Sequence, residues 1–310
     1  MWLLSLLWGC YSDHFLSHGV TEERIEYVYV QDNYIGGSDD TGSNEPIWVD
    51  SFEQPSVSNG VDIIWVIDGS GSMNNDYQMI LQGISDMLNN LPSLNWRLVI
   101  ISMTPYEAAA VTSFPLLPGD DQIDATLMFS DNVQGGNEHG FDSVYEFLMN
   151  NVFAQQWLRE DAALLTVFVS DENDQSTSRF PDPVMFANWL ASMRNEVYVS
   201  SIVNVLPENS ECTPNPIDVG LRYMELTNIF NGHVVDICST NWSQGVADAS
   251  SQITPREWLD LSKTPANEQE IYVFIDGIEF YDWYYSASEN RVYFNAIPDE
   301  RSLVEIAYYY

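Results

Sequence analysis

Continuous apolar runs that alternate with helix-like segments are the feature that most constrains the fold of this chain. Residues 61–67 (VDIIWVI) and 164–169 (LLTVFV) are almost wholly apolar, which is typical of strands buried on both faces of a sheet. Residues 76–91 follow the first run and carry apolar side chains at helical spacing. We therefore predict a mostly parallel sheet covered by helices on both faces, a doubly wound α/β fold of the Rossmann type.

The same alternation predicts the remaining elements of this domain. Further strands are expected at residues 96–102, 197–205 and 232–237, and further helices at residues 141–153, 183–193, 219–229 and 242–253. The predicted domain covers residues 58–255.

The flanking segments have different patterns. After residue 256 short strands are predicted at 271–275, 278–281, 291–295 and 303–310, the first two joined by the turn dipeptide Asp276-Gly277. Residues 256–310 are thus expected to form a small all-β module. Residues 11–57 are acidic and contain stretches rich in Gly, Ser and Asp, which predicts a polar tether.

The composition excludes several kinds of partner. The chain has 46 acidic and 10 basic residues and a formal net charge of −36. Nucleic acids and anionic lipids are bound by clustered Lys and Arg, so neither is an expected partner. The motifs H-E-x-x-H, G-x-x-x-x-G-K-[ST], G-x-S-x-G and C-x-x-C are missing from the sequence. We therefore expect a binding protein rather than an enzyme.

The cysteines bear on where the protein works. Residues 1–10 end in LWGC, which resembles a bacterial lipobox with Cys10 as the lipidated residue. This resemblance implies export and a lipid anchor in the cell envelope, at the outer membrane or cell surface. A buried or tag-like N-terminus, a secreted protein and a virion component are the alternatives. Cys212 and Cys238 form an even pair, which predicts a disulfide in an oxidising compartment; two buried free thiols are the alternative.

Oxygen-bearing side chains cluster directly after the first buried strand. Asp68, Ser70 and Ser72 alternate with glycines, which let the backbone turn so that all three side chains face one point. Asp171 follows the strand at 164–169 in the same way. Ligands of open α/β sheets bind beyond the carboxyl ends of the strands, and this oxygen set suits a hard divalent cation. Capping of helices by the two aspartates is the alternative.

This arrangement resembles the metal-ion-dependent adhesion site of von Willebrand factor type A domains, in which D-x-S-x-S after a buried strand is the first metal loop. The resemblance covers residues 58–255. It implies a bound Mg²⁺, or alternatively Ca²⁺ or Mn²⁺, and a protein or glycan partner that offers a carboxylate or another oxygen to the ion. The metal ligands that it implies are Asp68, Ser70, Ser72, Asn137 and Asp171.

The second metal loop departs from the family pattern. The family has a threonine where this chain has Asn137, in the segment Gly135-Gly136-Asn137-Glu138. The amide oxygen of Asn137 or the carboxylate of Glu138 is the candidate ligand from this loop. Two further acids, Glu172 and Asp174, are either solvated or contact the metal ligands and help to orient them.

Two hypotheses of function follow. The chain order of lipidated cysteine, tether, type A domain and short β module resembles lipid-anchored type A proteins of bacteria, and favours metal-dependent adhesion outside the cell. The alternative is a structural or assembly component of a cell-surface structure or virion. In that case aromatic side chains of the β module would make the contacts, namely Tyr281, Trp283, Tyr284, Tyr285, Tyr308, Tyr309 and Tyr310.

Overall fold

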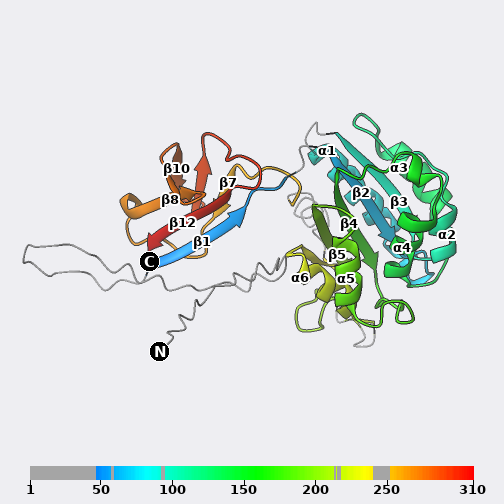
Figure 1. Ribbon diagram of the computed structural model, residues 1–310. Coiled ribbons are helices and arrows are strands. Elements are labelled where there is room, and N and C mark those ends of the chain that lie inside the picture. Colours follow the sequence, from blue (N-terminus) through cyan, green and yellow to red (C-terminus); the bar gives the residue numbers. More distant parts are fainter. Residues whose placement is uncertain (1–46, 57–58, 92–94, 213, 215–217, 240–251) are drawn as a thin grey trace, which may run out of the picture.

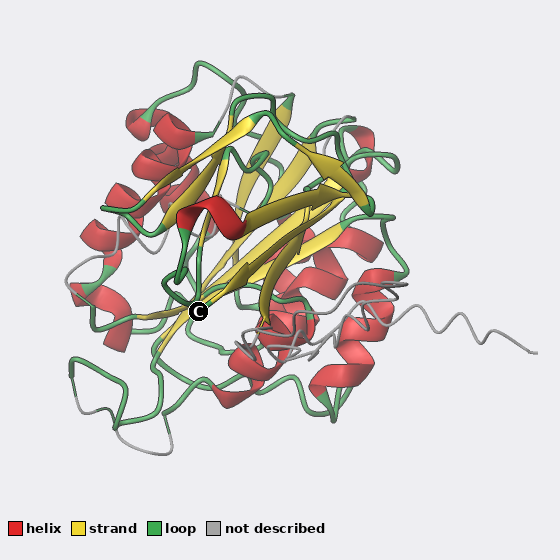
Figure 2. Cartoon of the chain, turned by 90° about the vertical axis from the view of Figure 1, so that its left-hand side faces the viewer, coloured by secondary structure: helices red, strands yellow, loops and turns green. Residues whose placement is uncertain are grey.

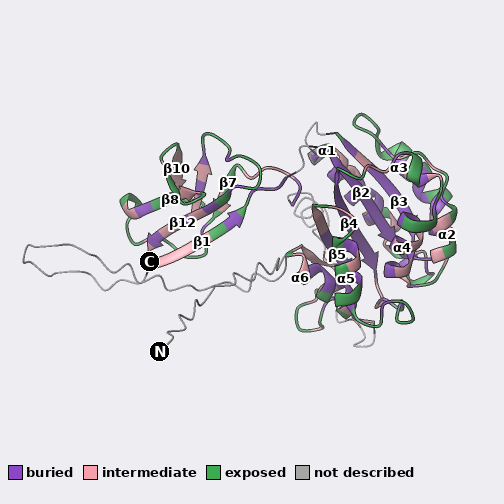
Figure 3. Cartoon of the chain, viewed as in Figure 1, coloured by how far each residue is buried: buried purple, intermediate pink, exposed green. Residues whose placement is uncertain are grey.

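The computed structural model describes residues 47–310 except residues 57–58, 92–94, 213, 215–217 and 240–251. Its larger part is built on a five-stranded parallel sheet in the order β3-β2-β4-β5-β6 (Figure 1). The strands are β2 (Val61–Ile67), β3 (Trp96–Ser102), β4 (Ala163–Ser170), β5 (Val197–Val203) and β6 (Val234–Asp236). Every residue of β2 and β4 is buried, as expected for central strands covered on both faces (Figure 3).

Helices cover both faces of this sheet (Figure 2). They are α1 (Tyr77–Asn90), α2 (Pro105–Ala110), α3 (Gln122–Asn132), α4 (Gly140–Asn150), α5 (Pro183–Ala191) and α6 (Leu221–Ile229), with short 3₁₀ turns η1 (Ser72–Asn75) and η2 (Ala154–Gln156). The predicted doubly wound α/β fold is confirmed. The helix predicted at 242–253 falls largely on residues outside the described part of the chain.

Two helices were not predicted, α2 and α3. The first is only six residues long, with Pro105 in its first turn. The second begins with a capping box made by Asp121 and Asp124, but it leaves Ile123 and Leu127 exposed. Because its apolar residues do not all face the core, its sequence lacks the clean stripe on which a helix prediction depends.

The β module consists of two antiparallel sheets, β1-β12-β8-β9 and β10-β11-β7. Its strands are β1 (Ile47–Glu53), β7 (Trp258–Asp260), β8 (Ile271–Ile275), β9 (Ile278–Phe280), β10 (Trp283–Ser286), β11 (Arg291–Phe294) and β12 (Leu303–Tyr309), with the 3₁₀ turn η3 (Glu268–Glu270) before β8. The predicted hairpin of β8 and β9 is confirmed. Both of its turn residues, Asp276 and Gly277, have positive φ, as a type I′ turn requires.

The module also contains a strand that precedes the larger domain in the sequence, and this corrects the predicted domain boundaries. β1 pairs with β12 along its whole length, from Ile47 opposite Tyr309 to Glu53 opposite Leu303 (Figure 1). The tether predicted at 11–57 is therefore wrong over residues 47–53, and the module is not confined to 256–310. The larger domain is inserted between β1 and β7. Residues 1–46, with the predicted lipidation site Cys10, lie outside the described residues.

Several contacts connect the module to the larger domain. The Arg301 guanidinium lies 2.7 Å from a carboxylate oxygen of Glu196, and the Ser56 N–H donates to the Tyr198 hydroxyl at 3.3 Å. Within the described residues, no helix is both long and apolar enough to cross a lipid bilayer.

Candidate metal centre

The first loop of the candidate centre is built directly on the end of β2. The Asp68 N–H donates to the Val169 carbonyl of β4 at 2.9 Å, which fixes the start of the loop. The Asp68 carboxylate is buried and accepts hydrogen bonds from the Ser70 N–H at 2.7 Å and from the Ser170 hydroxyl at 2.8 Å. The hydroxyls of Ser70 and Ser72 lie 2.8 Å apart. The D-x-S-x-S segment therefore gathers its three oxygen-bearing side chains at one point.

The third loop meets the first at the same edge of the sheet. β2 and β4 are parallel neighbours with Ile67 opposite Val169, so the residues that follow them emerge side by side. The Ser72 hydroxyl donates to a carboxylate oxygen of Asp171 at 3.2 Å. Ser72 is exposed, so this point is open to solvent.

The second loop packs closely on the first at Gly69, which has no side chain. A Cβ atom on Gly69 would lie 2.3 Å from the Gly135 carbonyl oxygen, and one on Gly136 would lie 3.6 Å from the Cα of Ser70. A Cβ atom on Gly71 would meet nothing closer than 3.9 Å. The close approach of the two loops thus depends on Gly69 rather than on every glycine of the motif.

The two candidate ligands of the second loop differ in burial. Asn137 is exposed, and its role as a ligand stays a prediction. Glu138 is only 8% exposed, and its carboxylate accepts a hydrogen bond from the Gln175 side chain at 2.7 Å. Burial, followed by repulsion from Asp68 and Glu172, raises the pKa of Glu138 to about 7. Glu138 is therefore the second-loop residue that is electrostatically coupled to the first and third loops.

The two acids after Asp171 have different surroundings. Asp174 is buried, lies 3.0 Å from the Arg222 guanidinium, and accepts the Phe141 N–H at the start of α4 at 3.1 Å. Its interpretation as a solvated acid is wrong, because the carboxylate is paired and anchors a helix. Glu172 is half-buried, and its pKa is raised by burial and then by Asp68 and Asp218.

The charge at the centre is not compensated by basic side chains. Asp62 and Asp68 lie at opposite ends of β2 and both are fully buried, but Asp62 is 2.7 Å from the Arg159 guanidinium. Within the described residues, no ion pair involves Asp68, Glu138, Asp171 or Glu172. Burial, followed by repulsion from Asp68, raises the pKa of Asp171 to about 6. A buried charge of this kind is unfavourable unless a cation pairs with it.

The donor set fits a hard divalent cation. Two carboxylates, Asp68 and Asp171, and two hydroxyls, Ser70 and Ser72, are linked by hydrogen bonds across two loops. Across the described ranges, no three His, Cys, Asp or Glu side chains gather as a metal site. The candidate centre instead combines carboxylate and hydroxyl oxygens, which Mg²⁺, Mn²⁺ and Ca²⁺ accept.

Some residues around the centre were not identified from the sequence. The Tyr77 hydroxyl donates to the Ser70 carbonyl at 3.2 Å, and Ser170 also accepts the Glu172 N–H at 3.0 Å. Asn204 donates to the main-chain carbonyl of Asp171. Of these, Asn204 had a usable signal, since it follows an apolar strand just as Asp68 and Asp171 do.

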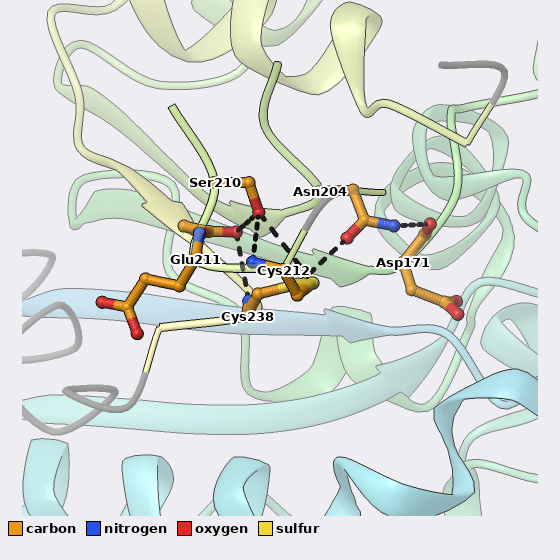
Figure 4. The surroundings of a disulfide bond; sticks show 7 residues. Asp171, Asn204, Ser210, Glu211, Cys212 and Cys238 are labelled. Carbon is orange, nitrogen blue, oxygen red and sulfur yellow. Dashed lines mark hydrogen bonds between the residues drawn. A yellow bond between two sulfur atoms is a disulfide. The ribbon is translucent and has the colours of Figure 1, made fainter. Parts of the chain in front are cut away.

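The predicted Cys212–Cys238 disulfide is present and lies near the third loop (Figure 4). It connects the segment after β5 with the segment after β6, 26 residues apart in sequence. The disulfide therefore borders the edge of the sheet that carries the candidate centre.

A doubly wound α/β domain with three oxygen-bearing loops at the carboxyl edge of its sheet defines the class of this protein. Residues 62–211 match the family model of the von Willebrand factor type A domain. This segment is therefore identified as a von Willebrand factor type A domain, as the resemblance of its loops implies. A search of curated protein sequences finds no match.

The chain is also similar to several solved structures at low sequence identity, three of which follow. A von Willebrand factor type A protein from Catenulispora acidiphila is 11% identical, with a TM-score of 0.43 over 87% of this chain and 66% of that one. The pilus adhesin SpaC from Lactobacillus rhamnosus GG is 14% identical, with a TM-score of 0.41 over 86% of this chain and 41% of that one. Manganese-loaded TRAP protein from Plasmodium vivax is 16% identical, with a TM-score of 0.37 over 74% of this chain and 90% of that one. The chain thus spans less than two thirds of the first two proteins.

Proposed function

We propose that this protein binds a partner outside the cell in a divalent-metal-dependent manner and is not an enzyme. The observation that carries the proposal is the convergence of Asp68, Ser70, Ser72 and Asp171 at one solvent-open point with uncompensated carboxylate charge. Mg²⁺ is the proposed ion, and Ca²⁺ or Mn²⁺ are alternatives with the same oxygen preference. When bound, such an ion supplies Lewis acidity that attracts an oxygen of the partner.

The proposed partner is a protein or glycan that offers a carboxylate or another oxygen. Ser72 lies at the centre and is exposed, so a partner group can reach this point from solvent. The net charge of −36 opposes phosphate-rich partners such as nucleic acids. An exported, lipid-anchored location remains part of this proposal and rests on the LWGC segment alone.

Arrays of extracellular proteins and glycans, probed with the full chain, test the proposed function. We expect retention on at least one array member in Mg²⁺ and its loss when EDTA is added, because the ion would bridge the two partners. Washing with EDTA and restoring Mg²⁺ is the control for irreversible damage. Retention that is the same with and without EDTA would contradict the proposal.

A role in assembly through the β module is the second candidate. Only the aromatic side chains that are exposed could make such contacts. Tyr308 is fully buried, and Trp283 and Tyr285 pack against the core of the module. Tyr281 and Tyr284 are exposed. If the module makes the contacts, Tyr281→Ala/Tyr284→Ala abolishes retention on the array and EDTA does not.

The pKa shifts predict how pH affects metal binding. The pKa values of Asp171 and Glu138 are raised to about 6 and about 7 from ordinary values of 3.8 and 4.5. Without metal, these groups therefore contribute stability that is fully present below their ordinary pKa values and is lost as pH rises through about 6 to 7. A cation competes with the protons, so its affinity is expected to fall steadily from about pH 8 to about pH 5.

Calorimetric titration with Mn²⁺ in buffers of different ionisation enthalpy measures this effect. We expect protons to be released on binding between about pH 6 and about pH 7, where both groups are partly protonated in the metal-free protein. An affinity that stays constant over this range would show that neither carboxyl group faces the bound ion.

A further inference from the structure

Asn204 occupies a defined place between the candidate centre and the disulfide. β4 and β5 are parallel neighbours with Ser170 opposite Val203, so Asp171 and Asn204 are the next residues on adjacent strands. Asn204 is buried, and its side-chain N–H donates to the main-chain carbonyl of Asp171 (Figure 4). The main-chain carbonyl of Asn204 accepts the Gly220 N–H at 2.9 Å, which fixes the backbone of Asn204.

The disulfide lies against the other end of the same amide. The Cys238 sulfur is 3.7 Å from the side-chain oxygen of Asn204. Because a disulfide sulfur carries no proton, this is a packing contact rather than a hydrogen bond. The Ile237 N–H donates to the Val203 carbonyl at 3.0 Å, which places Cys238 beside Asn204. The Asn204 amide is thus held between the disulfide and the Asp171 carbonyl.

Hydrogen bonds to Asp236 brace the two segments that the disulfide joins. Its carboxylate accepts from the Glu211 N–H at 2.7 Å, the Cys238 N–H at 3.1 Å and the Ser210 hydroxyl at 3.2 Å. These bonds hold the segments near one another without the covalent bond. Removing the disulfide should therefore disturb the Asp171 loop less than removing the Asn204 amide does.

We propose that Asn204 is a positioning residue for Asp171 and that the Cys212–Cys238 disulfide keeps Asn204 in place. The inference rests on the proposed function, since it concerns the affinity of the same metal centre. Without the amide, the main-chain carbonyl of Asp171 loses this donor, and the peptide after β4 is held less firmly. The direction of the Asp171 carboxylate toward Ser72 depends on that peptide. Groups that orient a metal ligand are typically worth 10- to 100-fold in affinity.

Calorimetric titration of the full chain with Mn²⁺ tests this inference. Asn204→Ala is expected to weaken Mn²⁺ binding by about 10- to 100-fold, and Cys212→Ala/Cys238→Ala by a smaller factor. Asn151→Ala is the matched control. Asn151 also has a buried side-chain amide, which donates to the Ala108 and Val111 carbonyls. It follows the C-terminal end of α4, whereas the second loop precedes the N-terminal end of this helix. It should leave the Mn²⁺ affinity unchanged even if it lowers the melting temperature.

Amide hydrogen exchange of the metal-free protein supplies a readout that needs no metal. Asn204→Ala should speed exchange in residues 171–174 specifically, whereas Asn151→Ala should not. If the wild-type chain binds no Mn²⁺, the proposed function fails, and faster exchange in Asn204→Ala still supports the positioning role. If the wild type binds Mn²⁺ and Asn204→Ala matches it in both affinity and exchange, the positioning role is overturned while the proposed function stands.

Discussion

Asp68→Asn is expected to abolish measurable Mn²⁺ binding while the domain stays folded. Asparagine has nearly the same shape, and its side-chain oxygen still accepts the Ser70 N–H, so the turn of the first loop is kept. The buried negative charge that attracts a cation is lost. Loss of a ligand should exceed the roughly 10- to 100-fold cost of losing a group that only supports one. Calorimetric titration measures the change.

The stability of the metal-free Asp68→Asn protein should not fall. The Asp68 carboxylate is fully buried, and burial raises its pKa, which means that its charged form is less favourable here than in water. Removing that charge removes an uncompensated cost. We therefore expect a metal-free melting temperature at or above that of the wild type, and no further rise when Mn²⁺ is added.

Asp62→Asn provides a control within the same strand. Asp62 is also fully buried, but it accepts two hydrogen bonds from the Arg159 guanidinium, at 2.7 and 2.9 Å, and one from its main-chain N–H at 2.8 Å. Weakening a buried ion pair from one side should lower the free energy of unfolding by up to about 3–5 kcal/mol. Asp62 lies about 20 Å from Asp68 along β2, so the Mn²⁺ affinity should not change. If a folded Asp62→Asn protein lost metal binding and Asp68→Asn kept it, the metal centre would lie at the Asp62 end of β2, and the proposed centre would be wrong.

The parts of the fold that could be predicted are those that depend on local pattern. β2 and β4 are buried on both faces, so their sequences are continuously apolar and locate the centre of the sheet. Once the strands are parallel, residues directly after them must lie at one edge. This rule predicts that Asp68 and Asp171 lie at the same edge. Their proximity follows from the pairing of β2 with β4, and the hydrogen bond from Ser72 to Asp171 agrees with it.

The parts that were missed depend on partners distant in the chain. The contacts of Glu138 with Gln175 and of Asn204 with Asp171 join loops 37 and 33 residues apart. Whether an acid or amide in such a loop points inward is decided by packing between loops, which leaves no periodic signal in the sequence. β1 is the extreme case, because Ile47 pairs with Tyr309 at the other end of the chain.

Phe52→Ala is expected to destabilise the β module severely, because β1 contributes this side chain to the core of the module. Phe52 is 8% exposed, and its ring centroid lies 6.0 Å from that of Phe294. Truncating a buried phenylalanine typically costs about 3–5 kcal/mol. A small two-sheet module has little stability to spare, so the variant should expose β8 and β12 to hydrogen exchange while the sheet around β2 stays protected.

Tyr281→Ala is the matched control, since it removes an aromatic ring that is 76% exposed in the same module. It should change the free energy of unfolding by no more than about 0.5 kcal/mol. Chemical denaturation combined with amide exchange compares the two variants. If Phe52→Ala costs no more than Tyr281→Ala, β1 does not belong to the module core. Residues 47–53 would then behave as part of a tether, and the type A domain would have a single structural connection to the module instead of two.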